Sequence, residues 1–161
     1  IALRLVGSEM CIRDRYLSES FWKPMGAKIS APWQLDSKEN NMVKAFCCIA
    51  SSARDFARVG KLYKQHGKWN GVQLLDSTFI AKSITPKFSN APFYGYGWWL
   101  ANYKNKEIFY TRGHLGQLSI VIPEDDLIIV RLGNFISGEE EGSAHSKDFY
   151  TYIDEAYNII K

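Results

Sequence analysis

Ser20 and Lys23, in the stretch SESFWKPMG, have the types and spacing of a nucleophile and its base. A serine that opens a helix and a lysine one turn later share a helical face, where the lysine can accept the hydroxyl proton. Pro24 follows the lysine directly, and the residue before a proline is disfavoured in the helical conformation. The helical turn should therefore end before it brings the two side chains together, and we do not assign the nucleophile to Ser20.

Tyr103 and Asn105, in the stretch YKNK, form a second pair with catalytic potential. This stretch falls where two predicted strands must reverse direction, and asparagine is an ordinary turn residue. Along an extended strand, the pair would also lie roughly 30 Å from His114. We predict that this pair is the tip of a hairpin.

His114 is the strongest candidate for chemistry, because it lies between Gly113 and Gly116 in TRGHLGQLSIVIP. Glycines within a strand remove side-chain packing and let a substrate or another backbone come close. One interpretation is a histidine at a strand edge with its hydrogen bonds satisfied. The other, which we prefer, is a histidine on a strand that points toward an open cleft.

Two helices are predicted upstream of these residues. Residues 51–67 place Ser52 three before Asp55, as an N-cap would be, with apolar residues on one face (Phe56, Val59 and Tyr63). Residues 76–84 begin with an aspartate that can cap a second, shorter helix.

After residue 95 the pattern changes to strands. Runs of β-branched and aromatic residues, separated by turn residues, predict an antiparallel meander over 95–103, 106–113, 116–123 and 127–134. A final amphipathic helix should pack on the sheet through one stripe (Phe149, Ile153, Ala156 and Ile160). The predicted class is α+β, with a meander flanked by helices.

Composition narrows the function classes. The 161 residues are 46% apolar and 14% aromatic, enough for one domain with a buried core. The net charge of +3 comes from scattered basic residues, which does not favour nucleic acid as a partner. No apolar run approaches the roughly 18 residues that span a bilayer.

The cysteines and histidines do not suggest a cofactor. Cys47 and Cys48 are adjacent, and we expect a pair of small buried thiols rather than a redox or metal site. The histidines, His66, His114 and His145, lack the spacing of metal ligands. We predict no metal and no organic cofactor.

Residues 1–15 differ in character from the rest of the chain. They place charges among apolar residues without a clean face, and VGSEMCIRDR looks like translated adapter sequence. We therefore expect 1–15 to be non-native and 16–161 to form the domain.

From Tyr16 onward, the chain resembles the C-terminal part of the serine β-lactamase-related hydrolases. This group contains class C β-lactamases, related esterases and 6-aminohexanoate dimer hydrolases. The stretches that carry the resemblance, in order, are FWKPMGA, SSARDFARVGKLY, GKWNGVQLL, YGYGWW and GHLGQLSIVIPEDDLIIVRLG. The resemblance covers about nine tenths of the chain.

The resemblance implies a β-lactamase/transpeptidase-like fold and hydrolysis of a small-molecule ester or amide through an acyl-enzyme. It places His114 to Gly116 at the family's His-x-Gly element beside the active site, and the backbone N–H of Gln117 as an oxyanion donor. Gly113 and Gly116 would border the substrate, and Trp98 would wall the pocket unless it packs in the core. The family's nucleophilic serine, lysine and tyrosine would precede this chain.

Two alternatives stay open on this resemblance. One is a D-Ala-D-Ala peptidase of the same architecture. The other is a non-catalytic penicillin-recognising domain that binds peptidoglycan or protein. Export to the periplasm or the outside of the cell is common in the family and is favoured for that reason alone; the oligomeric state is not predicted.

Overall fold

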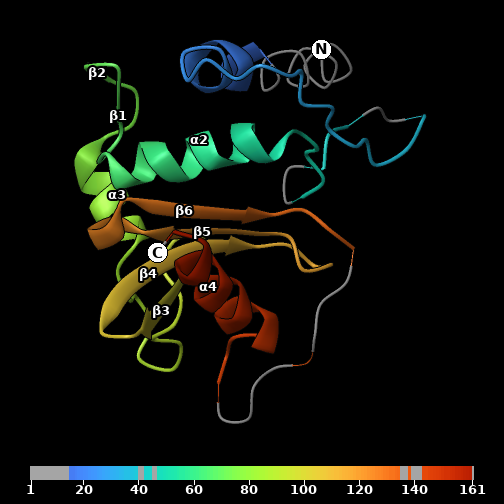
Figure 1. Cartoon of the computed structure of the whole chain (residues 1–161). Helices are drawn as coiled ribbons and strands as arrows, with labels where there is room; N and C mark the ends of the chain where they lie inside the picture. The colour runs from blue at the N-terminus through green and yellow to red at the C-terminus, as the bar shows by residue number, and fades with distance from the viewer. Residues whose placement is uncertain (1–14, 40–41, 45–46, 135–137, 139–142, 161) are drawn as a thin grey trace.

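A four-stranded antiparallel sheet, covered by one helix on each face, forms the centre of the computed structural model (Figure 1). The structure describes residues 15–39, 42–44, 47–134, 138 and 143–160, so nearly all of the segment expected to be non-native, 1–15, lies outside the described residues. The elements, in chain order, are η1 (Ser18–Trp22), α2 (Ala53–Lys64), β1 (Lys68–Trp69), β2 (Val72–Gln73), α3 (Ser77–Ser83), β3 (Trp99–Tyr103), β4 (Lys106–Arg112), β5 (Leu118–Ile122), η2 (Pro123–Asp125), β6 (Leu127–Arg131) and α4 (Lys147–Ile160).

The sheet is the predicted meander, with the order β3-β4-β5-β6 and every neighbouring pair antiparallel. Tyr103 pairs with Lys106, and the two residues between them, Lys104 and Asn105, have φ angles of 55° and 61°. Positive φ at both central residues is the mark of a type I′ hairpin turn. The Tyr-x-Asn pair is therefore a hairpin tip, as the sequence indicated.

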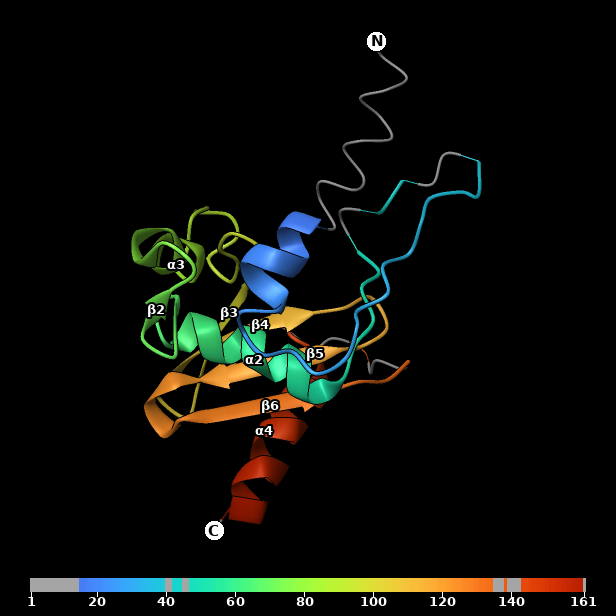
Figure 2. The ribbon, with the colours of Figure 1, turned by 90° about the horizontal axis from the view of Figure 1, so that it is seen from above.

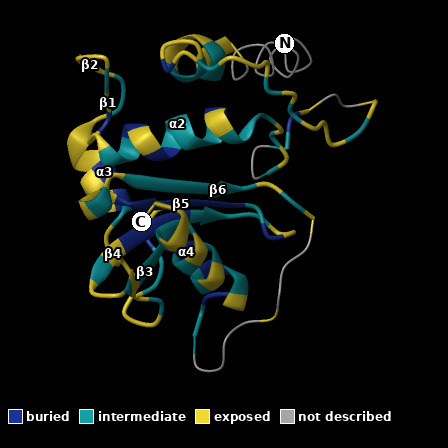
Figure 3. Ribbon diagram, viewed as in Figure 1, coloured by how far each residue is buried: buried dark blue, intermediate teal, exposed yellow. Residues whose placement is uncertain are grey.

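The two faces of the sheet build two separate cores. Ile108 and Tyr110 of β4 face α4 and pack with Phe149 and Ile153, which are fully buried. Phe109, between them, faces α2 on the other side. Every residue of β5 is buried because both faces of this central strand are covered (Figure 3).

Helix α2 begins and packs as its sequence predicts. The hydroxyl of Ser52 accepts a hydrogen bond from the backbone N–H of Asp55 at 3.1 Å, which caps the helix. Gly60 faces β5 so closely that an added Cβ would lie 2.8 Å from Cγ2 of Val121. A glycine at this position lets the helix approach the sheet.

Helix α4 follows the predicted stripe only in its first half. Phe149 and Ile153 are fully buried, as predicted for a helix that packs on the sheet. Ile160 is 59% exposed, so the prediction is wrong for this residue. The reason is geometric, since the end of α4 projects beyond the sheet (Figure 2). Tyr157 still packs against the core in this half, and the hydroxyl of Tyr103 donates to Asp154 at 3.0 Å.

The segment after η1 is fastened to α2 by the buried carboxylate of Asp55, and it runs alongside that helix (Figures 1 and 2). The backbone N–H groups of Lys28 and Ile29 donate to this carboxylate at 2.9 and 3.2 Å. The Ser52 hydroxyl donates at 2.9 Å, and the Arg58 guanidinium at 2.7 Å. Burial alone would raise the pKa of Asp55, but these donors outweigh burial and hold its pKa below the usual range.

Replacing this carboxylate by an amide should destabilise the fold. We expect Asp55→Asn to lower the free energy of unfolding at pH 7 by about 3 kcal/mol, because an amide brings an NH₂ group against N–H donors. Because the pKa of Asp55 is depressed in the folded state, its stabilisation is present above about pH 4 and is lost as the pH falls through the folded-state value. Urea unfolding at pH 7 and pH 3 should show a larger acid loss in the wild type than in the variant.

Asp76→Asn is the matched control. Asp76 caps α3 by accepting a hydrogen bond from the N–H of Phe79 at 2.7 Å, and it is exposed. Asparagine is an equally good N-cap, so the change should stay under about 0.5 kcal/mol. Equal losses in the two variants would contradict the role given to Asp55.

Candidate functional site

The turn between β4 and β5, residues 113–117, contains the residues that the sequence singled out. The N–H of Gly113 donates to the carbonyl of Gln117 at 2.8 Å, and the N–H of Gly116 donates back to the carbonyl of Gly113 at 3.1 Å. Gly116 has a φ of 81°, a conformation that favours glycine. The turn is therefore tight, and the glycines in it serve backbone geometry.

Two side chains hold this turn from outside its backbone. The amide of Gln117 donates to the carbonyl of Gly133 and accepts from the N–H of Leu115 at 3.2 Å. The guanidinium of Arg131, on β6, donates to the carbonyls of Gly116 at 2.7 Å and Leu115 at 3.3 Å. The turn is thereby fixed to the end of β6 and to the residues after it.

His114 lies at the exposed tip of this turn. The expectation that it sits on a strand is wrong, because β4 ends at Arg112 and β5 begins at Leu118. Among the described residues, none accepts a hydrogen bond from the backbone N–H of Gln117. An exposed imidazole and a backbone N–H without an acceptor among the described residues thus lie within one short turn. Together they could bind and polarise a carbonyl oxygen.

Trp98 lies in the core rather than on this turn. It is 4% exposed and packs against Tyr63 of α2 and Phe109 of β4, at centroid distances of 4.5 and 5.1 Å. This agrees with the core-packing alternative given for Trp98. Trp99 is half-buried on the other face of the sheet, where the guanidinium of Arg112 lies 5.1 Å from its ring.

Ser20 and Lys23 do not form a catalytic pair in the described structure. Both are exposed, and no hydrogen bond joins them within the described ranges. Ser20 lies in the π-helical turn η1, where the N–H of Lys23 bonds to the carbonyl of Ser18 at 2.9 Å, five residues back. The helix ends at Trp22, but Lys23 keeps helical angles (φ −66°, ψ −47°), so the expectation that Pro24 would force its neighbour out of the helical conformation is wrong.

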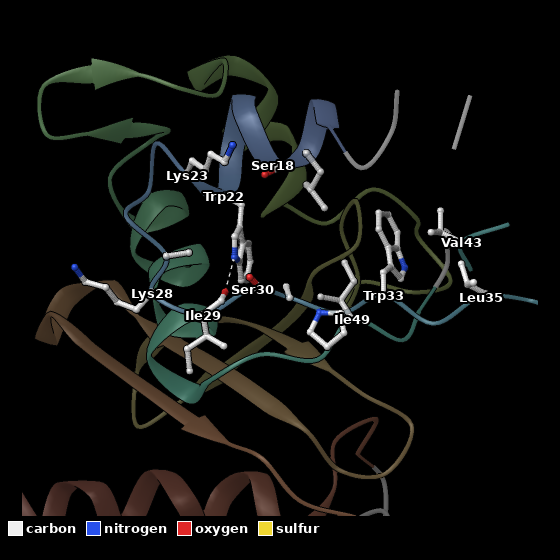
Figure 4. A pocket seen from close by; sticks show the side chains of 14 residues that line it. Ser18, Trp22, Lys23, Lys28, Ile29, Ser30, Trp33, Leu35, Val43 and Ile49 are labelled. Carbon is white, nitrogen blue, oxygen red and sulfur yellow. Dashed lines mark hydrogen bonds between the residues drawn. The ribbon is translucent and has the colours of Figure 1, made fainter. Parts of the chain in front are cut away.

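An apolar cavity of about 540 Å³ lies between η1 and the loop that precedes α2 (Figure 4). The indole N–H of Trp22 donates to the carbonyl of Ile29 at 3.1 Å across this region, and Trp33 forms part of the opposite wall. The other walls are mainly aliphatic and include Leu17, Leu35, Val43 and Ile49. The sequence did not predict this cavity, because its walls come from segments that lack a regular periodicity.

Cys47 and Cys48 form a disulfide with each other, which corrects the expectation of two buried thiols. Cys48 is exposed and Cys47 is half-buried. The flanking residues in AFCCIA are apolar and suggest a core segment, but the pair lies in a surface loop.

The described residues hold no group of three or more His, Cys, Asp or Glu side chains arranged to bind a metal ion. Within the same ranges, no helix has the length and apolar character needed to cross a membrane.

The fold is that of part of a β-lactamase-type hydrolase, with an α+β arrangement around a four-stranded antiparallel sheet. The chain is similar to a solved structure described as "Putative 6-aminohexanoate-dimer hydrolase from Bacillus anthracis", with 22% sequence identity and a TM-score of 0.66. The match covers 89% of this chain and 36% of that one, so this chain spans about a third of the matched protein. No protein-family model matches the chain, and a search of curated proteins gives no match. The likeness confirms the fold and the resemblance drawn from the sequence motifs.

The packing of the turn makes Gly113 sensitive to substitution. A Cβ at Gly113 would lie 2.3 Å from Oε1 of Gln117 and 3.0 Å from its Cβ. Gly113→Ala should therefore displace this side chain from its bonds to Leu115 and Gly133, lowering stability by about 1–2 kcal/mol. Gly138→Ala is the control, because no atom of the described residues lies within 4 Å of an added Cβ there. Thermal unfolding compares the two variants, and equal stability would contradict this account of the turn.

Proposed function

We propose that this chain supplies the C-terminal part of a serine hydrolase that cleaves an ester or amide bond through an acyl-enzyme. The observation that carries the proposal is the turn at 113–117, in a fold similar to part of a β-lactamase-type hydrolase. It presents an exposed imidazole at His114 and an unused backbone N–H at Gln117. The name of the matched structure refers to a hydrolase of a 6-aminohexanoate dimer, which is consistent with this class of substrate.

In the proposed reaction, a serine attacks the substrate carbonyl and water then hydrolyses the acyl-enzyme. The N–H of Gln117 donates to the developing oxyanion, a contact worth about 3 kcal/mol in such sites. His114 hydrogen-bonds the substrate or the group that moves the proton. Gly113 and Gly116, which shape the turn, border the acyl group in this proposal.

The nucleophile, its lysine and its tyrosine are proposed to come from a preceding part of the protein. Two observations support this proposal. The chain spans only 36% of the matched structure, and no hydrogen bond joins the exposed side chains of Ser20 and Lys23 within the described ranges. The reaction as proposed needs no metal and no organic cofactor.

The 161-residue chain alone should therefore show no hydrolase activity. Without a nucleophile, an acyl-transfer site keeps only the residual acceleration from binding and the oxyanion hole. The measurement is turnover of a chromogenic ester and a chromogenic cephalosporin by the purified chain, compared with its Ser20→Ala variant. Turnover that disappears in the variant would identify Ser20 as the nucleophile and overturn the proposal.

In the complete enzyme, His114→Ala should lower kcat/KM for the ester by about ten- to a thousandfold, if the imidazole contacts the transition state. Leu115→Ala is the matched control, because Leu115 is the next residue of the same turn and its side chain is 47% exposed. This control should leave kcat/KM within about threefold. Equal effects of the two substitutions would remove His114 from the proposed chemistry.

A further inference from the structure

The disulfide between Cys47 and Cys48 joins neighbouring residues, so the ring it closes contains no other residue. A disulfide stabilises a fold mainly by restricting the unfolded chain, and this effect grows with the length of the closed loop. A bond between adjacent residues contributes little in this way, and it ties no distant segments together. It is therefore not a structural cross-link of the fold.

Cys48 is open to a reagent from solution. It is exposed, and it lines a second cavity of about 480 Å³ together with Pro32, Trp33, Gln34, Ile49 and Ala50. A thiol that reduces a disulfide must reach one of its sulfurs, so access decides whether exchange can occur.

The backbone conformation of Cys48 should change when the disulfide is reduced. Its φ is 76°, a region that L-residues disfavour by about tenfold. Such a conformation persists only where the surroundings hold it. The covalent ring with Cys47 is one restraint on this residue, beside the hydrogen bond from Gln34 to its carbonyl, and reduction removes the ring.

The same backbone positions Trp33. The indole N–H of Trp33 is shared between the carbonyls of Cys47 at 2.9 Å and Lys44 at 3.0 Å. The carbonyl of Cys48 accepts a hydrogen bond from the N–H of Gln34 at 3.0 Å, and an antiparallel β-bridge pairs Trp33 with Ile49, the residue after the disulfide. Trp33 in turn lines the cavity of about 540 Å³ (Figure 4). The disulfide and the apolar cavity thus share one set of contacts.

We propose that the Cys47–Cys48 disulfide is a redox site for a dithiol, and that its reduction changes the position of Trp33 and the shape of the apolar cavity. A thiolate of the dithiol attacks Sγ of Cys48, which forms a mixed disulfide and breaks the bond to Cys47. The Cys47 sulfur leaves as a thiolate and takes up a proton. The second thiol of the reductant then displaces the Cys48 sulfur, which also takes up a proton. The dithiol is oxidised to a cyclic disulfide as two electrons and two protons pass to the protein.

The test uses the full chain with Cys11→Ser, so that only this pair of cysteines can react. Dithiothreitol is the dithiol, and mass spectrometry after alkylation counts the thiols. The oxidised protein should take up no alkyl group and the reduced protein should take up two, with the circular dichroism of the fold retained. 1-Anilinonaphthalene-8-sulfonate, an apolar probe, should bind about tenfold more weakly after reduction. This is the factor by which Cys48, without the ring, prefers other backbone conformations to its positive φ. Removing the reductant in air should restore both the absence of alkylation and the original affinity for the probe.

Variants distinguish an effect of the disulfide on Trp33 and the cavity from a general loss of structure. The double variant Cys47→Ser/Cys48→Ser should bind the probe as the reduced protein does and should not respond to dithiothreitol. Tryptophan emission should change on reduction, and Trp33→Phe should abolish this change. Trp69→Phe should retain the change, because Trp69 lies on the β1–β2 hairpin beside Lys61 and not at the cavity. Three results would each overturn the proposal: alkylation without reductant, reduction that leaves emission and probe binding unchanged, or reduction that occurs only with loss of the fold.

Discussion

The buried carboxylate of Asp55 is the interaction on which the arrangement of the N-terminal half depends. Among the described residues it is the only carboxylate that is fully buried, and its donors come both from α2 itself and from the segment at Lys28 and Ile29. Its own backbone N–H donates to the hydroxyl of Ser52, which is the N-cap of α2. One side chain therefore determines where the segment that lines the apolar cavity lies against the start of α2.

The turn at 113–117 depends on the sheet in a similar way. It is held by Gln117 from within and by Arg131 from the neighbouring strand, and both contacts require β4, β5 and β6 to be in register. That register is fixed because β5 is buried on both faces, so a slip by one residue would exchange two tightly packed cores. A rigid, doubly covered sheet thus presents a turn whose tip remains exposed.

The sequence predicted features that local chemistry controls. Ser52 and Asp76 cap helices through their own side chains, and Asn105 takes up the φ that a type I′ turn requires. The predictions that failed depend on contacts between distant segments. Whether His114 lies in a strand or a turn is decided by Gln117 and Arg131, and whether Ile160 is covered depends on how far α4 extends past the sheet. The apolar residues around Cys47 did not indicate a surface loop, because the position of this segment also depends on contacts with distant parts of the chain.

The meander has a further consequence for how the chain reaches this structure. Strands β3 to β6 pair only with their neighbours along the chain, through turns of a few residues, so these contacts close short loops at small entropic cost. The contacts of Asp55 with Lys28 and Ile29 instead span 27 and 26 residues. Proteins rich in local contacts fold faster than those that rely on distant ones. The pairing of the strands therefore costs less chain entropy than the attachment of the segment at Lys28 and Ile29 to α2.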